Sequence, residues 1–229
     1  MSTPRMHGIS SMATRALLAE LADAWRAQGG IEAGFESVGG VDAAKRVAAG
    51  EPFDLVVLAA DAIDKLLASG HAVGRRVDLV HSAVAIAVRQ GAPHADVGSE
   101  AALQQALRDA RSIGYSTGPS GTALLQLFER WGLAQTLRSR LVQAPPGVPV
   151  GALVARGEVE LGFQQRSELM HLSGIDVIGE MPAGARILTT FSAALCAASA
   201  QPQAVRELLD FMCAPGMAAV KRRHGMEPA

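Results

Sequence analysis

A strand followed by a small-residue turn and a helix is the pattern that most restricts how this chain can fold. It is clearest in residues 113–131, IGYSTGPSGTALLQLFERW, where apolar residues recur at helical spacing after the turn and Gly132 stands at a typical helix end. Hydroxyl residues and glycines fill the turn, beside the end of the helix where unpaired N–H groups and partial positive charge collect. The turn is therefore a candidate anion site, with an ordinary capped strand–helix turn as the alternative.

Two other uses of this turn are disfavoured. No Gly-Lys-Ser/Thr follows it, as a P-loop requires, and the three spaced glycines of a dinucleotide fingerprint are missing. Ser120 lies in Gly-Pro-Ser-Gly, but Thr122 replaces the last glycine of a nucleophile elbow. Neither a nucleotide ligand nor a serine nucleophile is therefore indicated.

The same layout occurs three times before residue 70. Strands are expected at 6–11, 31–38 and 53–59, and the helices after them at 12–27, 41–49 and 61–69. The third strand is a continuous apolar run, as expected where helices cover both faces of a sheet. Consecutive β–α units of this kind indicate a parallel sheet.

Two long extended segments, 77–89 and 187–198, separate this set from a second set of β–α units between Pro93 and Gly179. We therefore expect an α/β fold with two lobes, each a mostly parallel sheet flanked by helices, joined by a two-segment hinge. Residues 1–80 and 190–229 would form one lobe and residues 81–189 the other, with a ligand cleft between them. Ligands in such sheets bind at the carboxyl ends of the strands.

Composition excludes several classes of partner. The net charge is −1 and the basic residues are scattered, so nucleic acid is not expected. The two cysteines and six histidines show no metal-ligand spacing, and we expect neither a metal nor another cofactor. The start lacks the apolar core of a secretory signal, and no apolar run reaches membrane-spanning length. We expect a cytoplasmic protein, or a periplasmic one if an export signal precedes this sequence.

The order of these motifs resembles a known family. The segments Gly8-Ile-Ser-Ser-Met, Gly39-Gly40, Phe53-Asp-Leu-Val-Val-Leu-Ala-Ala60, residues 113–122 and Gly162-Phe-Gln-Gln165 together are similar to the molybdate-binding-protein-like branch of type 2 periplasmic solute-binding proteins. These are the substrate-binding components of ABC transporters, and the resemblance covers nearly the whole chain. It implies two lobes that close over a small anion, held by serine hydroxyls and backbone N–H groups. The ligand contacts it implies are Ser10, Ser11, Ser37, Gly39, Ala60, Tyr115, Ser120, Gly121, Thr122, Val150 and Gln164.

Charge sets this chain apart from binders of tetrahedral oxyanions, which use neutral donors. Arg15 is expected one turn into the first helix and Arg166 just after Gln164. A guanidinium presents a planar fork that suits a carboxylate, so we add Arg15 to the ligand contacts. A small organic acid therefore stands beside molybdate as an expected ligand. An ABC-transporter membrane component is an expected partner if the protein is exported.

The sequence leaves three functions open. The first is a solute-binding protein that captures a small anion without chemistry. The alternative is a cytoplasmic isomerase of an unsaturated polycarboxylate, because isomerases acting on aconitate resemble the same family. Its base would be Asp61, Tyr115 or Glu168, although Asp61 also suits a helix N-cap and Glu168 a solvated surface charge. The effector domain of a transcription regulator ranks last, because no DNA-binding helices precede the first strand.

Overall fold

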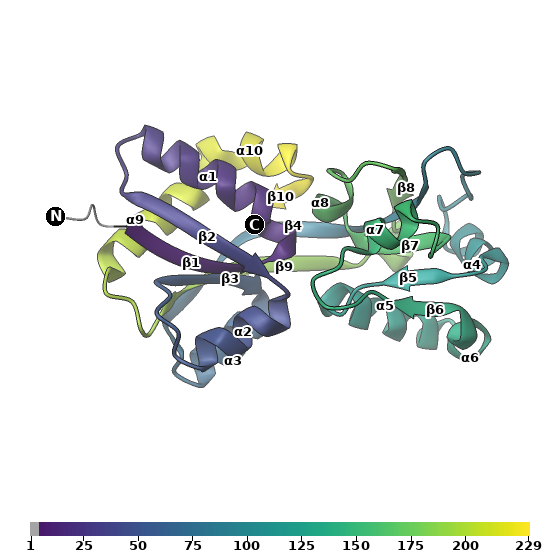
Figure 1. The fold of residues 1–229 in the computed structure, drawn as a ribbon, viewed down its shortest axis with the longest axis horizontal. Helices are drawn as coiled ribbons and strands as arrows, with labels where there is room; N and C mark the ends of the chain where they lie inside the picture. The colour runs from purple at the N-terminus through teal and green to yellow at the C-terminus, as the bar shows by residue number, and fades with distance from the viewer. Residues whose placement is uncertain (1–4) are drawn as a thin grey trace. The chain divides into compact units, whose positions relative to one another are not determined.

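The computed structural model describes residues 5–229 (Figure 1) and divides into two compact units. Unit 1 contains the residues up to His81 together with Thr190–Ala229, and unit 2 contains Ser82–Thr189. The chain passes from one unit to the other twice, inside strand β4 (Ala72–Arg89) and inside strand β9 (Leu188–Cys196). The division therefore falls within two long strands.

Unit 1 is built on a sheet with the strand order β2-β1-β3-β9-β4. The first three strands, β1 (Arg5–Ser11), β2 (Glu32–Val38) and β3 (Leu55–Ala59), are parallel, whereas β9 is antiparallel to β3. Its helices are α1 (Arg15–Ala27), α2 (Gly40–Ala48), α3 (Ala60–Ala68), α9 (Pro202–Cys213) and α10 (Ala218–Arg223). Short 3-10 turns, η1 (Met12–Thr14) and η4 (Pro215–Met217), precede α1 and α10, and β10 (Met226–Pro228) pairs with β4.

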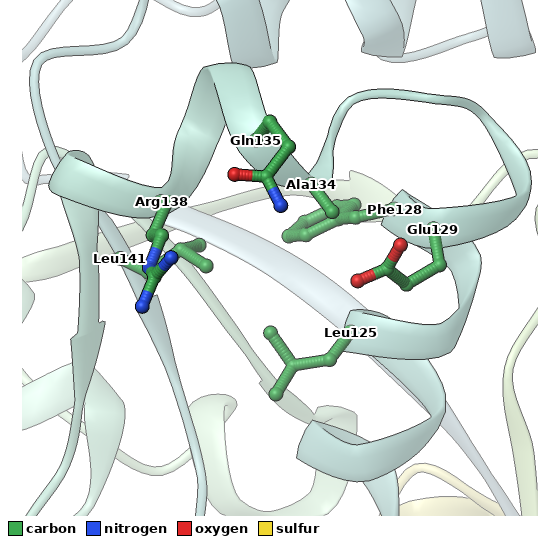
Figure 2. A pocket seen from close by; sticks show the side chains of 7 residues that line it. All are labelled: Leu125, Phe128, Glu129, Ala134, Gln135, Arg138 and Leu141. Atoms are coloured by element: carbon green, nitrogen blue, oxygen red, sulfur yellow. The ribbon is translucent and has the colours of Figure 1, made fainter.

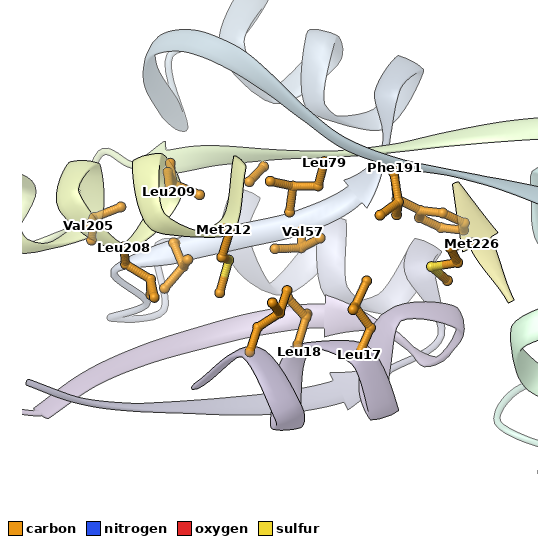
Figure 3. Close-up of a cluster of buried hydrophobic side chains, with 14 of the residues drawn as sticks. Leu17, Leu18, Val57, Leu79, Phe191, Val205, Leu208, Leu209, Met212 and Met226 are labelled. Carbon is orange, nitrogen blue, oxygen red and sulfur yellow. The ribbon is translucent and has the colours of Figure 1, made fainter. Parts of the chain in front are cut away.

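Both faces of this sheet are covered, and β3 shows why its sequence is apolar throughout. Leu55 and Val57 belong to a core cluster with α1 and α9, whereas Val56 and Leu58 belong to a cluster with α2 and α3. Successive strand residues point to opposite faces, so a strand buried on both sides has no polar positions. Figure 3 shows the first cluster, in which side chains of α1 and α9 surround Val57.

Unit 2 is a smaller sheet with the order β4-β7-β5-β6, and β8 (Ile175–Glu180) also pairs with β4. Strands β5 (Ile113–Tyr115), β6 (Leu141–Gln143) and β7 (Leu161–Gln165) are parallel to one another, and β4 is antiparallel to β7. The helices are α4 (Glu100–Asp109), α5 (Pro119–Arg130), α6 (Ala134–Leu137), α7 (Val150–Ala155) and α8 (Arg166–Leu169), with 3-10 turns η2 (Arg138–Arg140) and η3 (Ala183–Ala185). Phe128 of α5 packs edge-on against Phe163 of β7, with ring centroids 6.4 Å apart.

The expected α/β class is confirmed, and so are the local signals at helix ends. The Ser99 hydroxyl accepts from the Ala102 amide at 3.1 Å and caps α4, and Gly132 has φ 67° just after α5. The sequence did not predict β6, which lies at the start of a proline-rich stretch. Strand β7 begins only at Leu161, because Glu158 N–H still donates to the Leu153 carbonyl behind α7.

Among residues 5–229, no helix has both the length and the apolar character that crossing a bilayer requires. Cys196 is buried, Cys213 is exposed, and both are free thiols.

Candidate functional site

In unit 1, the expected contact residues lie where the parallel strands β1, β2 and β3 end. Ser10 of β1 and Ser37 of β2 are partners in register, and their hydroxyl oxygens are 2.8 Å apart. Ser10 is fully buried. Gly39 is the N-cap residue of α2, and Ala60 is the first residue of α3. Because parallel strands present their carboxyl ends at one edge, these turns share an edge of the sheet.

The hydroxyl of Ser11, the last residue of β1, is buried and has no hydrogen-bond partner among the described residues. Gly40 lies beside it, where an added Cβ would be 3.7 Å from the Ser11 Cβ and 3.8 Å from Leu58 Cδ2, which is ordinary contact. Leaving a buried hydroxyl unpaired costs about 1–3 kcal/mol. An acceptor oxygen of a ligand would remove that cost.

The charged residues of this edge are exposed. Arg15 is the first residue of α1 and makes no ion pair with any described residue. Asp61 forms a long ion pair with Lys65, with 3.8 Å between Nζ and Oδ2, and its side chain is 64% exposed. Asp61 is not the N-cap residue of α3 either, because that position is Ala59. Exposure and a neighbouring cation make Asp61 an unsuitable base.

In unit 2, the turn between β5 and α5 is tightly folded. The hydroxyls of Ser116 and Ser120 are 3.0 Å apart, and Ser120 is buried. A Cβ added to Gly121 would lie 1.9 Å from the Ser116 carbonyl oxygen, so only glycine fits there without a backbone shift. Ser116 was not among the expected contacts, although it belongs to the same run of small residues.

This turn offers fewer free amides than the sequence predicted. The N–H groups of Gly121 and Thr122 both donate to the Gly118 carbonyl, and Pro119 has no N–H. In the first turn of α5, this leaves the Ser120 amide without a backbone carbonyl partner among the described residues. The expected cradle of several amides is therefore wrong in its detail. What remains is the Ser120 amide together with two adjacent hydroxyls; Thr122 itself is exposed.

The end of β7 carries a hydrogen-bonded chain of three residues. Gln164 Oε1 accepts from the Gly151 amide near the start of α7 at 3.2 Å, and Gln164 Nε2 donates to Glu168 Oε1 at 2.8 Å. Gln164 is 3% exposed, and the neighbouring Val150 is fully buried. The amide of Gln164 thus makes one hydrogen bond at each end inside unit 2.

Burial raises the pKa of Glu168 to about 7, and the hydrogen bond from Gln164 opposes that rise. No charged side chain of the described residues contributes to this shift. Removal from water destabilises the ionised carboxylate, so the group titrates near neutrality. Glu168 is half-buried with a raised pKa, which does not match the alternative of a solvated surface charge.

Arg166 and Tyr115, which the sequence also singled out, make contacts within unit 2. Arg166 Nη1 forms an ion pair with Glu180 Oε1 at 2.7 Å, so a partner from β8 already occupies its guanidinium. Tyr115, at the end of β5, is half-buried and packs against the core cluster that contains Phe163; its hydroxyl has no hydrogen-bond partner among the described residues.

A shallow hollow of about 250 Å³ lies elsewhere in unit 2, on the surface formed by α5, α6 and η2 (Figure 2). Leu125, Phe128, Ala134 and Leu141 make it apolar, and Glu129, Gln135 and Arg138 complete the lining. None of the expected contact residues lines it. Within residues 5–229, no group of three or more His, Cys, Asp or Glu side chains is arranged to hold a metal ion.

Sequence reasoning missed another set of buried polar groups in unit 2. The Ser82 hydroxyl, the Gln165 Oε1 and the Ser167 hydroxyl have no hydrogen-bond partners within the described part of the chain. Gln165 Nε2 donates to the Thr189 hydroxyl at 2.7 Å. No local motif marks these residues; of the three, Gln165 lies in the pairing of β4 with β7.

Comparisons with known proteins agree with this architecture. An aconitate isomerase of Pseudomonas sp is 42% identical over 185 residues, covering 80% of this chain and 70% of that protein. The periplasmic molybdate-binding protein of Azotobacter vinelandii superposes with a TM-score of 0.81 at 19% identity, covering 98% of this chain and 99% of that one. The sulfate-binding protein of Mycobacterium tuberculosis gives 0.80 at 17% identity, with coverage of 98% and 87%. These two structural likenesses concern the fold.

The profile of the bacterial extracellular solute-binding proteins matches residues 7–227. That match spans nearly every element described above, from β1 to β10. The chain therefore belongs to the bacterial extracellular solute-binding protein family.

Proposed function

We propose that this chain binds a small unsaturated polycarboxylate and isomerises it by proton transfer, with aconitate as the substrate. The observation that carries this proposal is Glu168, a carboxyl group with a pKa of about 7 at the end of the strand where ligands of α/β sheets bind. The 42% identity to an aconitate isomerase supports the choice of substrate.

A carboxyl group that titrates near neutrality suits both halves of a proton transfer. At pH 7 the carboxylate and the acid are similarly populated, so the group accepts a proton and returns it with little loss in either direction. An ordinary glutamate, with its pKa near 4.3, would be too weak a base. Asp61 lacks these properties because it is exposed and faces Lys65.

Aconitate has a CH₂ group and a CH= group on either side of its central carbon, each bearing a carboxylate. Removal of a proton from the CH₂ group gives an allylic anion, and return of that proton to the former CH= carbon moves the double bond to the other side. Because the two arms have the same substituents, the product is again aconitate, in either the cis or the trans form. One base that gives back the proton it took balances the reaction.

Hydrogen-bond donors that suit an anion support the proposed ligand binding. In unit 1, the Ser11 hydroxyl has no hydrogen-bond partner among the described residues and Arg15 makes no ion pair with them. In unit 2, taken by itself, the Ser120 amide has no backbone partner among them. Hydroxyl and amide donors replace the hydration of an anion without a counter-charge, whereas a guanidinium favours a carboxylate. This mixture suits an organic acid better than a tetrahedral oxyanion.

A second candidate is capture of a small anion for an ABC transporter, in which no reaction follows binding. Family membership and the likeness to molybdate- and sulfate-binding proteins favour it. In that case the protein would work in the periplasm with a membrane partner, and Glu168 would contribute to ligand affinity.

The test is to follow cis-aconitate by proton NMR with the purified protein. We expect conversion to the trans isomer. In Glu168→Gln the rate of this conversion should fall by about 100-fold or more, because the amide cannot accept the proton. Asp61→Asn is the matched control and should keep the wild-type rate. If wild-type protein leaves cis-aconitate unchanged but binds a small anion, the capture function replaces the isomerase.

A further inference from the structure

We propose that Gln164 is a positioning residue that holds the Glu168 carboxyl group through one hydrogen bond, and that it does not contact the ligand. This differs from its expected place among the ligand contacts. The role of Gln164 in catalysis rests on the proposed isomerisation, but its effect on the Glu168 carboxyl group does not.

The hydrogen bonds assign the orientation of the Gln164 amide. The Gly151 N–H can only donate, so the atom 3.2 Å from it must be the amide oxygen. The NH₂ group therefore faces Glu168 Oε1 at 2.8 Å and can only donate to it. Both ends of the amide are engaged and the side chain is 3% exposed, so the second N–H of Gln164 has little access to a ligand.

This arrangement makes the two oxygens of Glu168 unequal. Oε1 accepts from Gln164, whereas Oε2 forms no hydrogen bond with any described residue. The donor stabilises the carboxylate and leaves Oε2 as the atom that takes up the proton. Without Gln164, the carboxyl group could rotate and its proton would not be confined to one oxygen.

Few titratable groups lie on the elements around Glu168, and His171 is the nearest histidine along the chain, three residues further on. Strand β7 and helix α7 contain no charged residue, and Arg89 is the charged residue that β4 carries within unit 2. Arg166 pairs with Glu180, and Asp176 of β8 pairs with His94 at 3.3 Å. Tyr115 is the titratable residue of β5. Burial and the Gln164 hydrogen bond are thus what act on Glu168.

The variant Gln164→Met removes the donor at similar side-chain length. A lost hydrogen bond to an ionised group should raise the Glu168 titration midpoint by about one to two pH units. Carbon-13 NMR of glutamate-labelled protein measures that midpoint, and Glu168→Gln identifies the signal. The acid limb of the pH profile of kcat/KM for aconitate should shift to higher pH by the same amount.

Gln165→Met is the matched control, because Gln165 is equally buried but points to the opposite face of the sheet and donates to Thr189. It should change neither the midpoint nor the profile. An unchanged midpoint in Gln164→Met, or an equal shift in Gln165→Met, would overturn the positioning role. If Gln164→Met does not fold, Gln164→Asn gives the same test, since its amide is one methylene too short.

The result also separates the two proposals. A shifted midpoint with no isomerisation by wild-type protein would refute the isomerase and leave the effect of Gln164 on Glu168 intact. Isomerisation by wild-type protein with an unshifted midpoint would support the enzyme and refute the role of Gln164.

Discussion

At the scale of single residues, this protein places its unusual chemistry at strand ends. Ser10 pairs with Ser37, Ser116 pairs with Ser120, and the half-buried Glu168 has one hydrogen-bond donor. Hydrogen bonds offset the cost of burying the serine hydroxyls, whereas burial of the Glu168 carboxylate is compensated only in part. The stability of the protein should therefore depend on pH through Glu168.

Glu168 should make the folded state less stable as pH rises. Its pKa of about 7 in the folded protein lies above the value of 4.5 for an unperturbed glutamate, so the folded state binds the proton more tightly. The free energy of unfolding should therefore fall between about pH 4.5 and pH 7, by up to about 3 kcal/mol. Urea unfolding at intervals of pH measures this slope.

Glu168→Gln is the variant that tests this linkage. Glutamine does not titrate, so the fall in stability between about pH 4.5 and pH 7 should be smaller by the Glu168 contribution. Glu158 is an exposed control that pairs with Arg156, and Glu158→Gln should keep the wild-type slope over this range. Parallel stability curves for wild type and Glu168→Gln would show that the carboxyl group has an ordinary pKa.

Gly121 tests the packing of the turn before α5. In Gly121→Ala the new methyl group would meet the Ser116 carbonyl oxygen at 1.9 Å, so the backbone must move. We expect a loss of about 1–3 kcal/mol in unfolding free energy and weaker anion binding, because Ser116 and Ser120 would separate. In the control Gly118→Ala, the nearest atom to the new Cβ is 3.9 Å away. Equal stability of the two variants would contradict this account.

At the scale of secondary-structure elements, α4 shows how tertiary contacts complete a helix. Ser99 caps its first turn. Its last carbonyls are capped from outside, because Arg140 Nη1 donates to the carbonyl oxygens of Leu107, Arg108 and Ala110 at 3.3, 2.7 and 2.6 Å. A guanidinium there satisfies unpaired acceptors and complements the negative end of the helix.

Arg140→Met should therefore lower the unfolding free energy by about 1–3 kcal/mol. Arg138→Met, two residues away, removes the same charge from an exposed side chain with no ion pair among the described residues, and should change stability by less than about 0.5 kcal/mol. Ser99→Ala should cost about 1 kcal/mol, and Ser99→Gly only a few tenths. Thermal or urea unfolding measures all four. Similar effects of the two arginine variants would rule out the capping role.

At the scale of the whole molecule, ligand binding should appear as increased stability. A ligand at 100 times its dissociation constant adds about 2.7 kcal/mol, which raises the melting temperature of a chain of this size by roughly 5–10 °C. We expect cis- and trans-aconitate to produce this shift and molybdate, tungstate and sulfate to produce less. Arg15→Ala should reduce the shift with aconitate and not the shift with an oxyanion. A shift with oxyanions alone would favour the capture function.

Much of the fold follows from local pattern. Apolar periodicity and the glycine at position 132 locate the strands and helices to within a few residues, because these signals depend on neighbours along the chain. Strand β6 was not predicted because a proline-rich stretch follows it directly, without the small-residue turn and helix that mark the equally short β5. The register that brings Ser10 opposite Ser37 also came from the structure, since strand pairing joins residues that are distant in sequence.

The candidate site could likewise be predicted from the sequence only in part. The sequence by itself determined the succession of β–α units, the small-residue turns at the strand ends and the short set of carboxylates from which a base could come. Only the tertiary structure separated Glu168 from Asp61, gave Arg166 its partner Glu180 and engaged both ends of Gln164. The physical reason is that desolvation and ion pairing depend on what surrounds a side chain in space, and those surroundings come from distant segments of the chain.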